Sequence, residues 1–441
     1  MTKKYSFSGG VHPASHKGND KALTSPKPVI KLKPPELVII PLLQHLGSPC
    51  KPLVKPGDPV TIGQKIGEAT SFVSAHVHAS ISGTVKAVKN HPHLSGVDVL
   101  SVFIENDYKD TMFPGLSKPD VASLTQKEIV ECIKEAGIVG MGGATFPAHV
   151  KYSPPPDKPI DTVILNAAEC EPYLTTDHRL MLEHTEDVVK GLELIARAVG
   201  AKDIYIAIED NKPDAVKAFQ EAVPPGIKVS VMKTKYPQGA EKQVITSVTG
   251  RQVPSCGLPF EVGIVVANAA TAYAVYQAVY LGLPSYERVV TVTGCVKEPA
   301  NFLCPIGTPF SILFEAAGGF TEQPAKVISG GPMMGIAVNS LDLTVVKGTS
   351  GLLALTARQA DKQKESNCIR CGKCVDVCPI GLKPLYINAY AMKNDFENAD
   401  KLHAADCIEC GCCSYVCPAK RYLLPSIRLA KAEILKLRKK K

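Results

Sequence analysis

The hydrophobic pattern divides the chain into segments of different period. In residues 36–115, short β-type runs such as ELVIIPL and SGTVKAVK alternate with turns such as KPGDPV. In residues 116–286, strand-like runs such as TVILNAAE, DIYIAIED and IKVSVMK alternate with helical stretches such as EDVVKGLELIARAVG. Strands that alternate with helices predict an α/β layer on a mostly parallel sheet. The first of these segments therefore predicts a β domain and the second an α/β domain.

Three further segments complete the predicted organisation of the 441 residues, a length that suits several domains. Residues 1–35 are rich in Lys, Pro and Gly and predict an extended arm. Residues 287–360 are β-rich and contain GGPMMG. Residues 361–441 contain two cysteine motifs in an otherwise helical pattern. The sequence therefore predicts a multidomain α/β protein with a helical C-terminal domain.

The longest uncharged run lies between Glu261 and Glu287 and is long enough to span a bilayer. However, it begins VGIVVANAAT, a pattern typical of a buried strand that reaches a polar turn, and continues with Tyr273, Tyr276 and Gln277. We expect a strand followed by a buried helix, with a membrane span as the alternative. The N-terminal MTKKYSFSGG has no apolar run, which argues against a secretory signal.

The net charge of +8 is concentrated at the two ends of the chain. The tail RLAKAEILKLRKKK predicts a basic helix with one apolar face, formed by Ile427, Ala430, Ile434 and Leu437. Such a helix suits an anionic lipid surface or an acidic partner, but it equally suits a solvated helix end whose basic residues complement the helix dipole. No other feature indicates nucleic-acid binding.

Two C-x2-C-x2-C-x3-C-P motifs contain eight of the fifteen cysteines. In two-cluster ferredoxins with this spacing, the fourth cysteine of each run ligates the other cluster. We therefore expect two [4Fe–4S] clusters, one held by Cys368, Cys371, Cys374 and Cys417 and the other by Cys407, Cys410, Cys413 and Cys378. Zinc is the alternative, but zinc sites usually pair shorter C-x2-4-C units. Cys412 is expected to be a bystander, and the six scattered cysteines favour a reducing compartment.

A glycine-rich stretch, GIVGMGGATFPAHVK, occupies residues 137–151. The backbone amides of such a loop are able to cradle a phosphate, although a tight turn has the same composition and the spacing departs from G-x-G-x-x-G. Asn166 follows the predicted strand TVIL, at the sheet edge where parallel strands present ligands. A turn-capping role is the alternative for this residue.

Four stretches in order, GMGGATFPAHVK, LNAAECEP, YPQGAEKQ and LPFEVGIVVANAAT, resemble the flavoprotein (NADH-oxidising) subunit of respiratory complex I. The resemblance implies that FMN and the dinucleotide are bound by Gly140, Gly142, Gly143, Phe146, Lys151, Asn166, Glu169, Glu171 and Asn268. Glu241 matches the second acid of the family's G-E-E motif, beside the nicotinamide, and is the implied catalytic residue.

Two positions depart from that pattern. Ala168 replaces the acid of the family's N-A-D-E segment, and Ala240 replaces the first acid of G-E-E. These departures bear more on the nicotinamide than on the flavin. They keep open a second hypothesis, in which the chain is a non-enzymatic iron–sulfur relay or scaffold with a vestigial flavin site.

The whole chain, from GGVHP through QHLG, GGPMMG and KGTSG to the double cysteine motif, resembles the RnfC family of the Rnf/Rsx electron-transport complex. Within it, KPGDPVTIGQKIGEA and ASISGTVKAV are similar to a biotinyl/lipoyl-type barrel-sandwich domain, and residues 289–320 are similar to the β-grasp-like SLBB module. The hairpin HVHASISG has no lysine for a swinging arm, so we expect a docking barrel.

The resemblance implies a peripheral NAD(H)-linked oxidoreductase subunit without a transmembrane span, on the cytoplasmic face of a bacterial membrane. Electrons would pass between NADH or NAD+, FMN and two [4Fe–4S] clusters, because a flavin converts two-electron into one-electron transfer. Other subunits of a membrane complex, and ferredoxin indirectly, are the implied partners, with coupling to Na+ or H+ translocation. A diaphorase subunit of a soluble hydrogenase or formate dehydrogenase is the alternative; it matches the barrel, GGPMMG and the cysteine tail less well.

Overall fold

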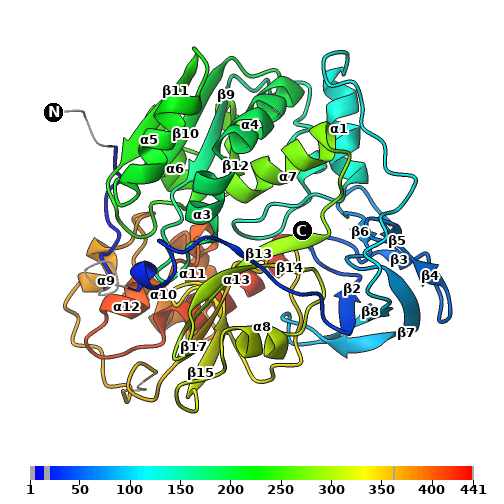
Figure 1. Cartoon of the computed structure of the whole chain (residues 1–441). Helices are drawn as coiled ribbons and strands as arrows, with labels where there is room; N and C mark the ends of the chain where they lie inside the picture. The colour runs from blue at the N-terminus through cyan, green and yellow to red at the C-terminus, as the bar shows by residue number, and fades with distance from the viewer. Residues whose placement is uncertain (1–4, 14–19, 361–362, 440–441) are drawn as a thin grey trace.

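A computed structural model describes residues 5–13, 20–360 and 363–439 (Figure 1). These residues form four β-sheets and a helical C-terminal module, and the predicted multidomain α/β organisation is confirmed. Parts of the predicted arm and the last residues of the basic tail lie outside the described residues.

The N-terminal β domain consists of two small antiparallel sheets whose apolar residues meet in one core, with Val38, Ile66 and Ile104 fully buried. One sheet has the order β2-β8-β7-β4, formed by β2 (Leu37–Pro41), β4 (Pro59–Val60), β7 (Gly83–Pro92) and β8 (Asp98–Asn106). The other is β3-β5-β6, formed by β3 (Lys51–Pro52), β5 (Lys65–Glu68) and β6 (Val77–His78).

The α/β domain is built on a parallel sheet of order β11-β10-β9-β12. Its strands are β9 (Thr162–Ala167), β10 (Asp203–Glu209), β11 (Ile227–Met232) and β12 (Ile264–Asn268). Its helices are α1 (Gln126–Glu135), α2 (Ala148–Lys151), α3 (Thr176–Glu183), α4 (Thr185–Val199), α5 (Pro213–Ala222), α6 (Glu241–Thr249) and α7 (Ala269–Tyr280), with a 3-10 turn at Pro259–Val262.

Helices cover both faces of this sheet (Figure 1). Helices α1, α4, α5 and α7 share one apolar core with the sheet, while α6 packs on the opposite face. Gly191 allows α4 to approach α7 closely, because a Cβ atom there would stand 1.9 Å from the Ala272 carbonyl oxygen. A sheet buried on both faces explains why its strands are nearly continuous apolar runs.

The long uncharged run forms β12 and then the largely buried helix α7. This confirms the expected strand and helix. Within the described parts of the chain, no helix combines the length and the hydropathy that a membrane crossing requires.

A six-stranded mixed sheet follows, with the order β1-β14-β13-β17-β15-β16. Its strands are β1 (Ile30–Lys31), β13 (Glu287–Gly294), β14 (Ala300–Pro305), β15 (Lys326–Ser329), β16 (Ile336–Val338) and β17 (Gly351–Leu355), and α8 (Phe310–Ala316) packs on it. The β-rich stretch 327–360 is part of this sheet, because its fully buried strand β17 pairs with β13. The N-terminal arm also contributes to this sheet through β1, after a 3-10 turn at Lys21–Leu23.

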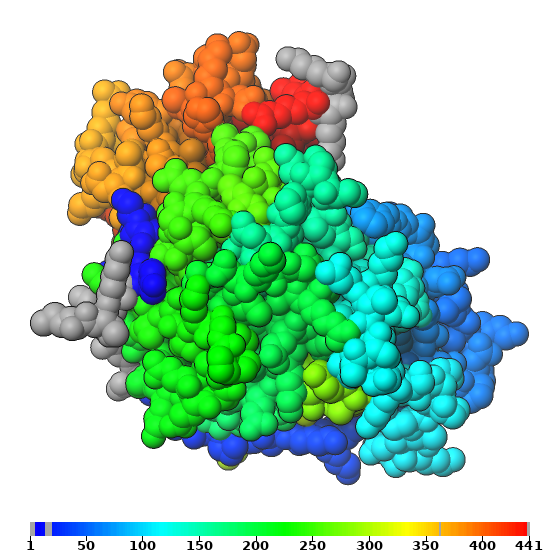
Figure 2. Space-filling model, turned by 90° about the horizontal axis from the view of Figure 1, so that it is seen from above, coloured from blue at the N-terminus to red at the C-terminus, as the bar shows by residue number. Residues whose placement is uncertain are grey.

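The C-terminal module is helical, as predicted, and packs beside the α/β domain (Figure 2). It contains α9 (Lys373–Asp376), α10 (Pro384–Ala391), α11 (Phe396–Lys401), α12 (Cys412–Val416) and α13 (Leu423–Lys439), with a 3-10 turn at Ala404–Asp406. On α13, Ile427, Ala430 and Ile434 are buried in the module's core, whereas Leu437 is 51% exposed. Most of the predicted apolar face therefore packs inside the chain, and Leu437 does not belong to it.

Candidate functional site

Two asparagines lie at the point where the strand order of the parallel sheet reverses. The chain proceeds from β9 to β10 and β11, then returns to place β12 on the other side of β9. Asn166, near the end of β9, lies directly opposite Asn268, the last residue of β12. Ligands of open α/β sheets bind at the carboxyl ends of strands at such a switch point. The fold thus brings together two predicted site residues that are far apart in sequence.

The glycine-rich loop is anchored on both sides of its tip. Gly140 N donates to the Phe146 carbonyl oxygen at 2.9 Å, and Val139 pairs with Pro147. Met141 N donates to Thr271 Oγ1 of α7 at 2.9 Å, and the buried Arg288 donates through Nη2 to the Met141 carbonyl at 3.1 Å. These bonds leave the exposed tip, Gly142 and Gly143, projecting from a fixed base.

The tip is suited to an anion. The amides of Gly142 and Gly143 donate to no acceptor within the described parts of the chain. A Cβ atom on Gly142 would stand 2.7 Å from Asn268 Nδ2, so the loop passes directly over that asparagine, while Gly143 faces open space. Free amides on a glycine loop fit a phosphate group such as that of FMN. This observation supports the flavin site independently of the sequence resemblance.

Asn268 is itself held in place. Its Oδ1 accepts from Ala270 N at 2.9 Å, which caps α7, and its Nδ2 donates to Asp177 Oδ2 at 2.6 Å. Burial raises the pKa of Asp177. The side-chain amide beneath the loop therefore has one fixed orientation.

Lys151 and Glu241 form an ion pair of 2.6 Å between α2 and the first residue of α6. Both side chains are partly exposed. Close by in the sequence, Gly239 accepts through its carbonyl oxygen from Asn166 Nδ2 at 2.7 Å. The predicted phosphate lysine and the predicted catalytic glutamate are thus neighbours, and the segment before α6 is tied to the end of β9.

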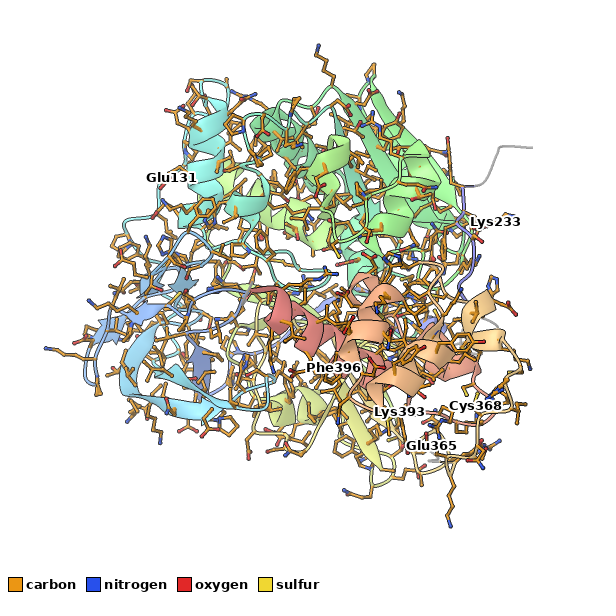
Figure 3. The ribbon with its side chains drawn as sticks, turned by 180° about the vertical axis from the view of Figure 1, so that it is seen from behind. Glu131, Lys233, Glu365, Cys368, Lys393 and Phe396 are labelled. Carbon is orange, nitrogen blue, oxygen red and sulfur yellow. The ribbon has the colours of Figure 1, made fainter. Side chains whose placement is uncertain are left out.

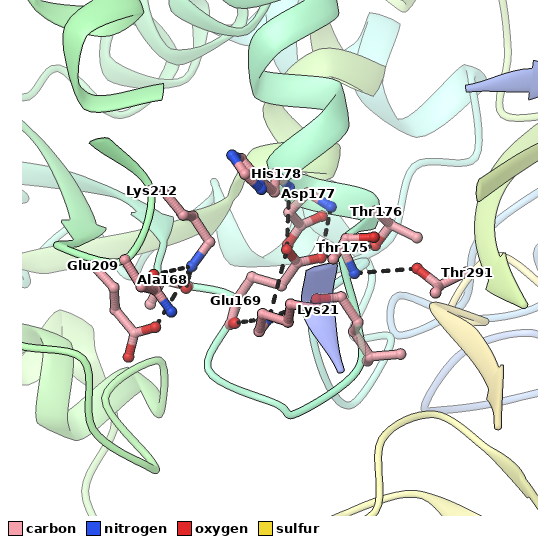
Figure 4. Close-up of polar contacts among 12 residues, drawn as sticks. Lys21, Ala168, Glu169, Thr175, Thr176, Asp177, His178, Glu209, Lys212 and Thr291 are labelled. Carbon is pink, nitrogen blue, oxygen red and sulfur yellow. Dashed lines mark hydrogen bonds and ion pairs between the residues drawn. The ribbon is translucent and has the colours of Figure 1, made fainter. Parts of the chain in front are cut away.

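Glu169 lies behind this surface, in a buried polar cluster (Figure 4). Its carboxylate accepts from the amides of Asp177 at 2.7 Å and His178 at 3.2 Å at the start of α3, and Lys21 Nζ donates to its carbonyl oxygen at 2.8 Å. Burial raises the pKa of Glu169 to about 7. The structure therefore places Glu169 where it orients α3 and, through Asp177, Asn268.

Glu171 contacts a different loop. Its carboxylate accepts from the amides of Met333 at 3.2 Å and Met334 at 2.7 Å, in the GGPMMG segment. Gly331 is required there, because a Cβ atom would stand 2.3 Å from Glu171 Oε2. Burial raises the pKa of Glu171 to about 7. Two neighbouring acids of one motif thus hold two different elements.

The eight motif cysteines surround two separate hollows. The first cavity is lined by Cys368, Cys371, Cys374 and Cys417. The second cavity is lined by Cys378, Cys407, Cys410 and Cys413, with Cys412 as a fifth cysteine. In each, three cysteines come from one motif and the fourth from the other, which is the grouping that the motif spacing predicts.

The two cysteine loops, 368–374 (first loop) and 407–413 (second loop), have the same backbone conformation. Arg370 and Glu409 occupy equivalent positions with positive φ, and so do Gly372 and Gly411, each of which precedes a short helix. Backbone amides point at ligand sulfurs: Arg370 N lies 3.4 Å from Cys368 Sγ, and Glu409 N lies 3.4 Å from Cys407 Sγ.

These cavities fit clusters better than single ions. Among the residues that the structure describes, no three metal-binding side chains converge on one ion position. Four cysteines instead line each hollow without meeting at one point. This arrangement argues against the zinc alternative, which requires about 2.3 Å from each sulfur to one centre.

Several residues that matter for the site carried no signal in the sequence. Asp177, Thr271 and Arg288 contact the loop or its asparagine across the fold, and Tyr236 is fully buried and donates to the Cys410 carbonyl oxygen at 2.8 Å. The partners are separated by 91 to 174 positions, so only the fold brings them together. GGPMMG was visible as a motif, but its contact with Glu171 was not.

Comparison with family models agrees with this arrangement. The RnfC barrel sandwich hybrid domain matches residues 5–109, the Nuo51 FMN-binding domain residues 133–277, the SLBB domain residues 289–337 and the 4Fe-4S dicluster domain residues 367–420. The expected cofactors, FMN and two [4Fe–4S] clusters, are confirmed by the second and fourth of these matches.

Relatives match over almost the whole chain. The C subunit of the Na(+)-translocating ferredoxin:NAD(+) oxidoreductase complex of Acetobacterium woodii is 49% identical, over 99% of both chains. The C subunit of the proton-translocating ferredoxin:NAD(+) oxidoreductase complex of Clostridium ljungdahlii is 46% identical, over 89% of this chain and 86% of the relative.

A solved structure shares the fold. A chain of the NAD+-reducing [NiFe]-hydrogenase in its H2-reduced state superposes with a TM-score of 0.51 at 18% identity. The match covers 71% of this chain and 63% of that one. The barrel, the flavin-binding domain, the dicluster module and the two full-length relatives lead to one conclusion: the chain belongs to the RnfC family, the C subunits of ion-translocating ferredoxin:NAD(+) oxidoreductase complexes.

Proposed function

We propose that the chain is the NAD(H)-interacting electron-transfer subunit of a membrane-bound ferredoxin:NAD+ oxidoreductase. The names of both relatives support this assignment. We place it peripherally on the cytoplasmic face of the membrane, in contact with other subunits of the complex and with ferredoxin only indirectly. Partner subunits would translocate the Na+ or H+ to which electron transfer is coupled.

One observation carries the proposal: a six-residue segment, 236–241, connects the flavin site to the second cavity. Its first residue, Tyr236, donates to the carbonyl oxygen of Cys410. Its fourth, Gly239, accepts from Asn166. Its last, Glu241, pairs with Lys151. The residues that would hold a flavin and those that would hold a cluster are therefore linked by a short stretch of backbone.

The residues at the switch point would each contact a different part of FMN. The amides of Gly142 and Gly143 and the ammonium of Lys151 would hold the phosphate, while Asn166 and Asn268 supply amide groups beneath the loop. Phe146 and Glu241 would border the nicotinamide. A bound flavin supplies the conversion between two-electron transfer with a nicotinamide and one-electron transfer with iron–sulfur clusters.

Glu169 and Glu171 act on this site through other residues. Glu169 fixes the start of α3, so that Asp177 meets Asn268. Glu171 fixes the GGPMMG segment, whose Met333 carbonyl faces Gly411 of the second loop. We assign the eight cysteines as cluster ligands in the two groups that line the cavities.

Cofactor content tests the proposal. The purified, reconstituted chain is expected to contain one FMN and two clusters. Lys151→Ala removes the phosphate partner and is expected to lower FMN affinity by about tenfold or more, with iron content unchanged. Lys158→Ala, an exposed lysine a few residues further on, is the matched control. Absence of FMN from the wild type, or equal FMN affinity in all three proteins, would contradict the proposal.

The second hypothesis, a relay without flavin chemistry, rests on Ala168 and Ala240. Ala240 is the residue directly before α6, and Ala168 is fully buried. A chain with both clusters but no FMN would favour the relay.

A further inference from the structure

The two cavities differ in how the rest of the chain covers them. The second cavity faces the α/β domain: besides Tyr236, Gln243 donates to the Pro379 carbonyl oxygen at 3.0 Å, and Gly10 N donates to the Val377 carbonyl at 2.8 Å. Asp406, next to Cys407, accepts from Cys256 N at 2.6 Å. The N-terminal arm and the α/β domain thus pack against the residues around the second cavity.

The first cavity lies toward the outside. Cys368 and Cys371 are exposed, and Ile369 between them has 68% of its surface exposed. Figure 3 shows Cys368 and Glu365 near the outer edge of the module. An isoleucine with two thirds of its surface in water, beside two exposed cysteines, marks a surface that a partner would bury.

The chemistry of this face is basic. Five basic residues and two acids lie in the stretches 363–376 and 418–422, which contain or adjoin residues that line the cavity: Lys364, Arg370, Lys373, Lys420 and Arg421 against Glu365 and Asp376. Glu365 is already paired with Arg421 at 3.0 Å. Exposed Tyr386 and Tyr422 add apolar area next to these charges. A face with an apolar centre and a basic rim complements an acidic protein surface.

We propose that this face, the first-cavity face, docks the acidic surface of a one-electron redox protein or subunit. The proposal rests on the proposed function and adds to it the place where electrons enter or leave. Single electrons would be exchanged there: the partner's cofactor is oxidised as the cluster in the first cavity is reduced, or the reverse, with no bond made or broken. The second cavity, held against the α/β domain, would serve only internal transfer toward the flavin.

Binding measures the docking directly. The probe is a small acidic plant-type ferredoxin, which stands in for the acidic one-electron partner subunit and is titrated calorimetrically into the reconstituted full chain at rising NaCl concentration. The wild type is expected to bind, with affinity that falls as salt rises. The triple variant Lys364→Glu, Lys373→Glu and Lys420→Glu is expected to bind at least about tenfold more weakly at low salt, with a flatter salt dependence.

A matched triple variant carries the same charge change on the N-terminal β domain: Lys51→Glu, Lys55→Glu and Lys109→Glu, all exposed. It is expected to bind within about twofold of wild type. Stopped-flow transfer from prereduced ferredoxin should follow the same order. Iron content checks that both clusters are present, and Lys364→Glu alone, outside the cysteine loops, replaces the triple variant if iron is lost.

Two outcomes would overturn the docking proposal. One is equal binding by the wild type and both triple variants. The other is attachment to phosphatidylserine vesicles that the first triple variant abolishes while its ferredoxin binding is unchanged, since the basic rim would then serve a membrane. Neither readout depends on FMN, so a chain without flavin that still binds ferredoxin through these lysines would refute the proposed function but support the docking.

Discussion

The two cysteine loops have nearly the same sequence and backbone, yet their surroundings are opposite. The third residue of the first loop is Arg370, which is exposed, whereas the third of the second loop is Glu409, which binds Arg428 at 2.8 Å and Lys431 at 3.0 Å on α13. A Cβ atom on Gly372 would meet nothing within 4 Å, but on Gly411 it would stand 3.1 Å from the Met333 carbonyl oxygen. The motif determines the ligands, and the residues between the ligands determine which loop faces inward.

The largest predicted effect follows from the exchange of the fourth cysteine ligand between the two clusters. Cys378→Ala is expected to destroy the cluster of Cys407, Cys410 and Cys413, because Cys378 lines the second cavity although it belongs to the first motif. Iron content would fall by about half, and the EPR signal of the first cluster would remain. Cys417→Ala is the mirror experiment. Loss of the Cys368 cluster alone in Cys378→Ala would contradict this assignment.

The free energy of unfolding should depend on pH through Glu171, whose contact with GGPMMG supports the second loop. Glu171 holds GGPMMG against Gly411, and burial raises its pKa to about 7 from the ordinary 4.5. The folded chain therefore binds more protons than the unfolded chain between these values, so the free energy of unfolding falls as pH rises from 4.5 to 7, by about 3 kcal/mol for this group.

Glu171→Gln should remove that part of the slope in anaerobic urea unfolding between pH 5 and 7.5. Glu169, whose pKa is also raised to about 7, contributes a similar slope that remains in the variant. An unchanged slope in Glu171→Gln would show that burial does not raise the pKa of this carboxyl group.

Gly372 and Gly411 occupy equivalent positions in the two loops, so the same substitution at each compares outward with inward packing. Both have positive φ, so alanine costs about 1 kcal/mol at either position. Gly411→Ala should cost about 1 kcal/mol more than Gly372→Ala, because its methyl group also presses on the Met333 carbonyl. The midpoint of urea unfolding compares the two variants, and equal midpoints would remove this distinction between the loops.

The smallest effect concerns the bond between the α/β domain and the second loop. Tyr236→Phe leaves the Cys410 carbonyl without its donor and is expected to cost about 1 kcal/mol of unfolding free energy. Tyr422→Phe, at an exposed residue near the first cavity, should change the free energy by less than about 0.5 kcal/mol. A cost as large for Tyr422→Phe would contradict the contrast between the two sides.

Much of the fold could be predicted from hydrophobic periodicity and motif spacing. The parallel strands, the strand and helix between Glu261 and Glu287, and the grouping of cysteines were predictable because each depends on local pattern or on ligand spacing. The contribution of β1 to the six-stranded sheet was not, because two residues of an extended arm have no periodicity.

The candidate site shows the same limit. The glycine loop and Asn166 could be recognised from composition and from their place after a strand. That Lys151 pairs with Glu241, or that Glu171 supports GGPMMG, depends on how distant segments pack. The inward and outward orientation of the two cysteine loops likewise depends on Tyr236, Met333 and α13, which no motif connects to them.

The central claim is that this chain joins a nicotinamide-linked flavin site to two clusters. An anaerobic NADH titration of the reconstituted chain, followed by visible absorbance and EPR, tests it most directly. The flavin band is expected to bleach on addition of NADH. Cluster absorbance without a flavin band, and no change on addition of NADH, would contradict the claim and leave the chain as an iron–sulfur relay.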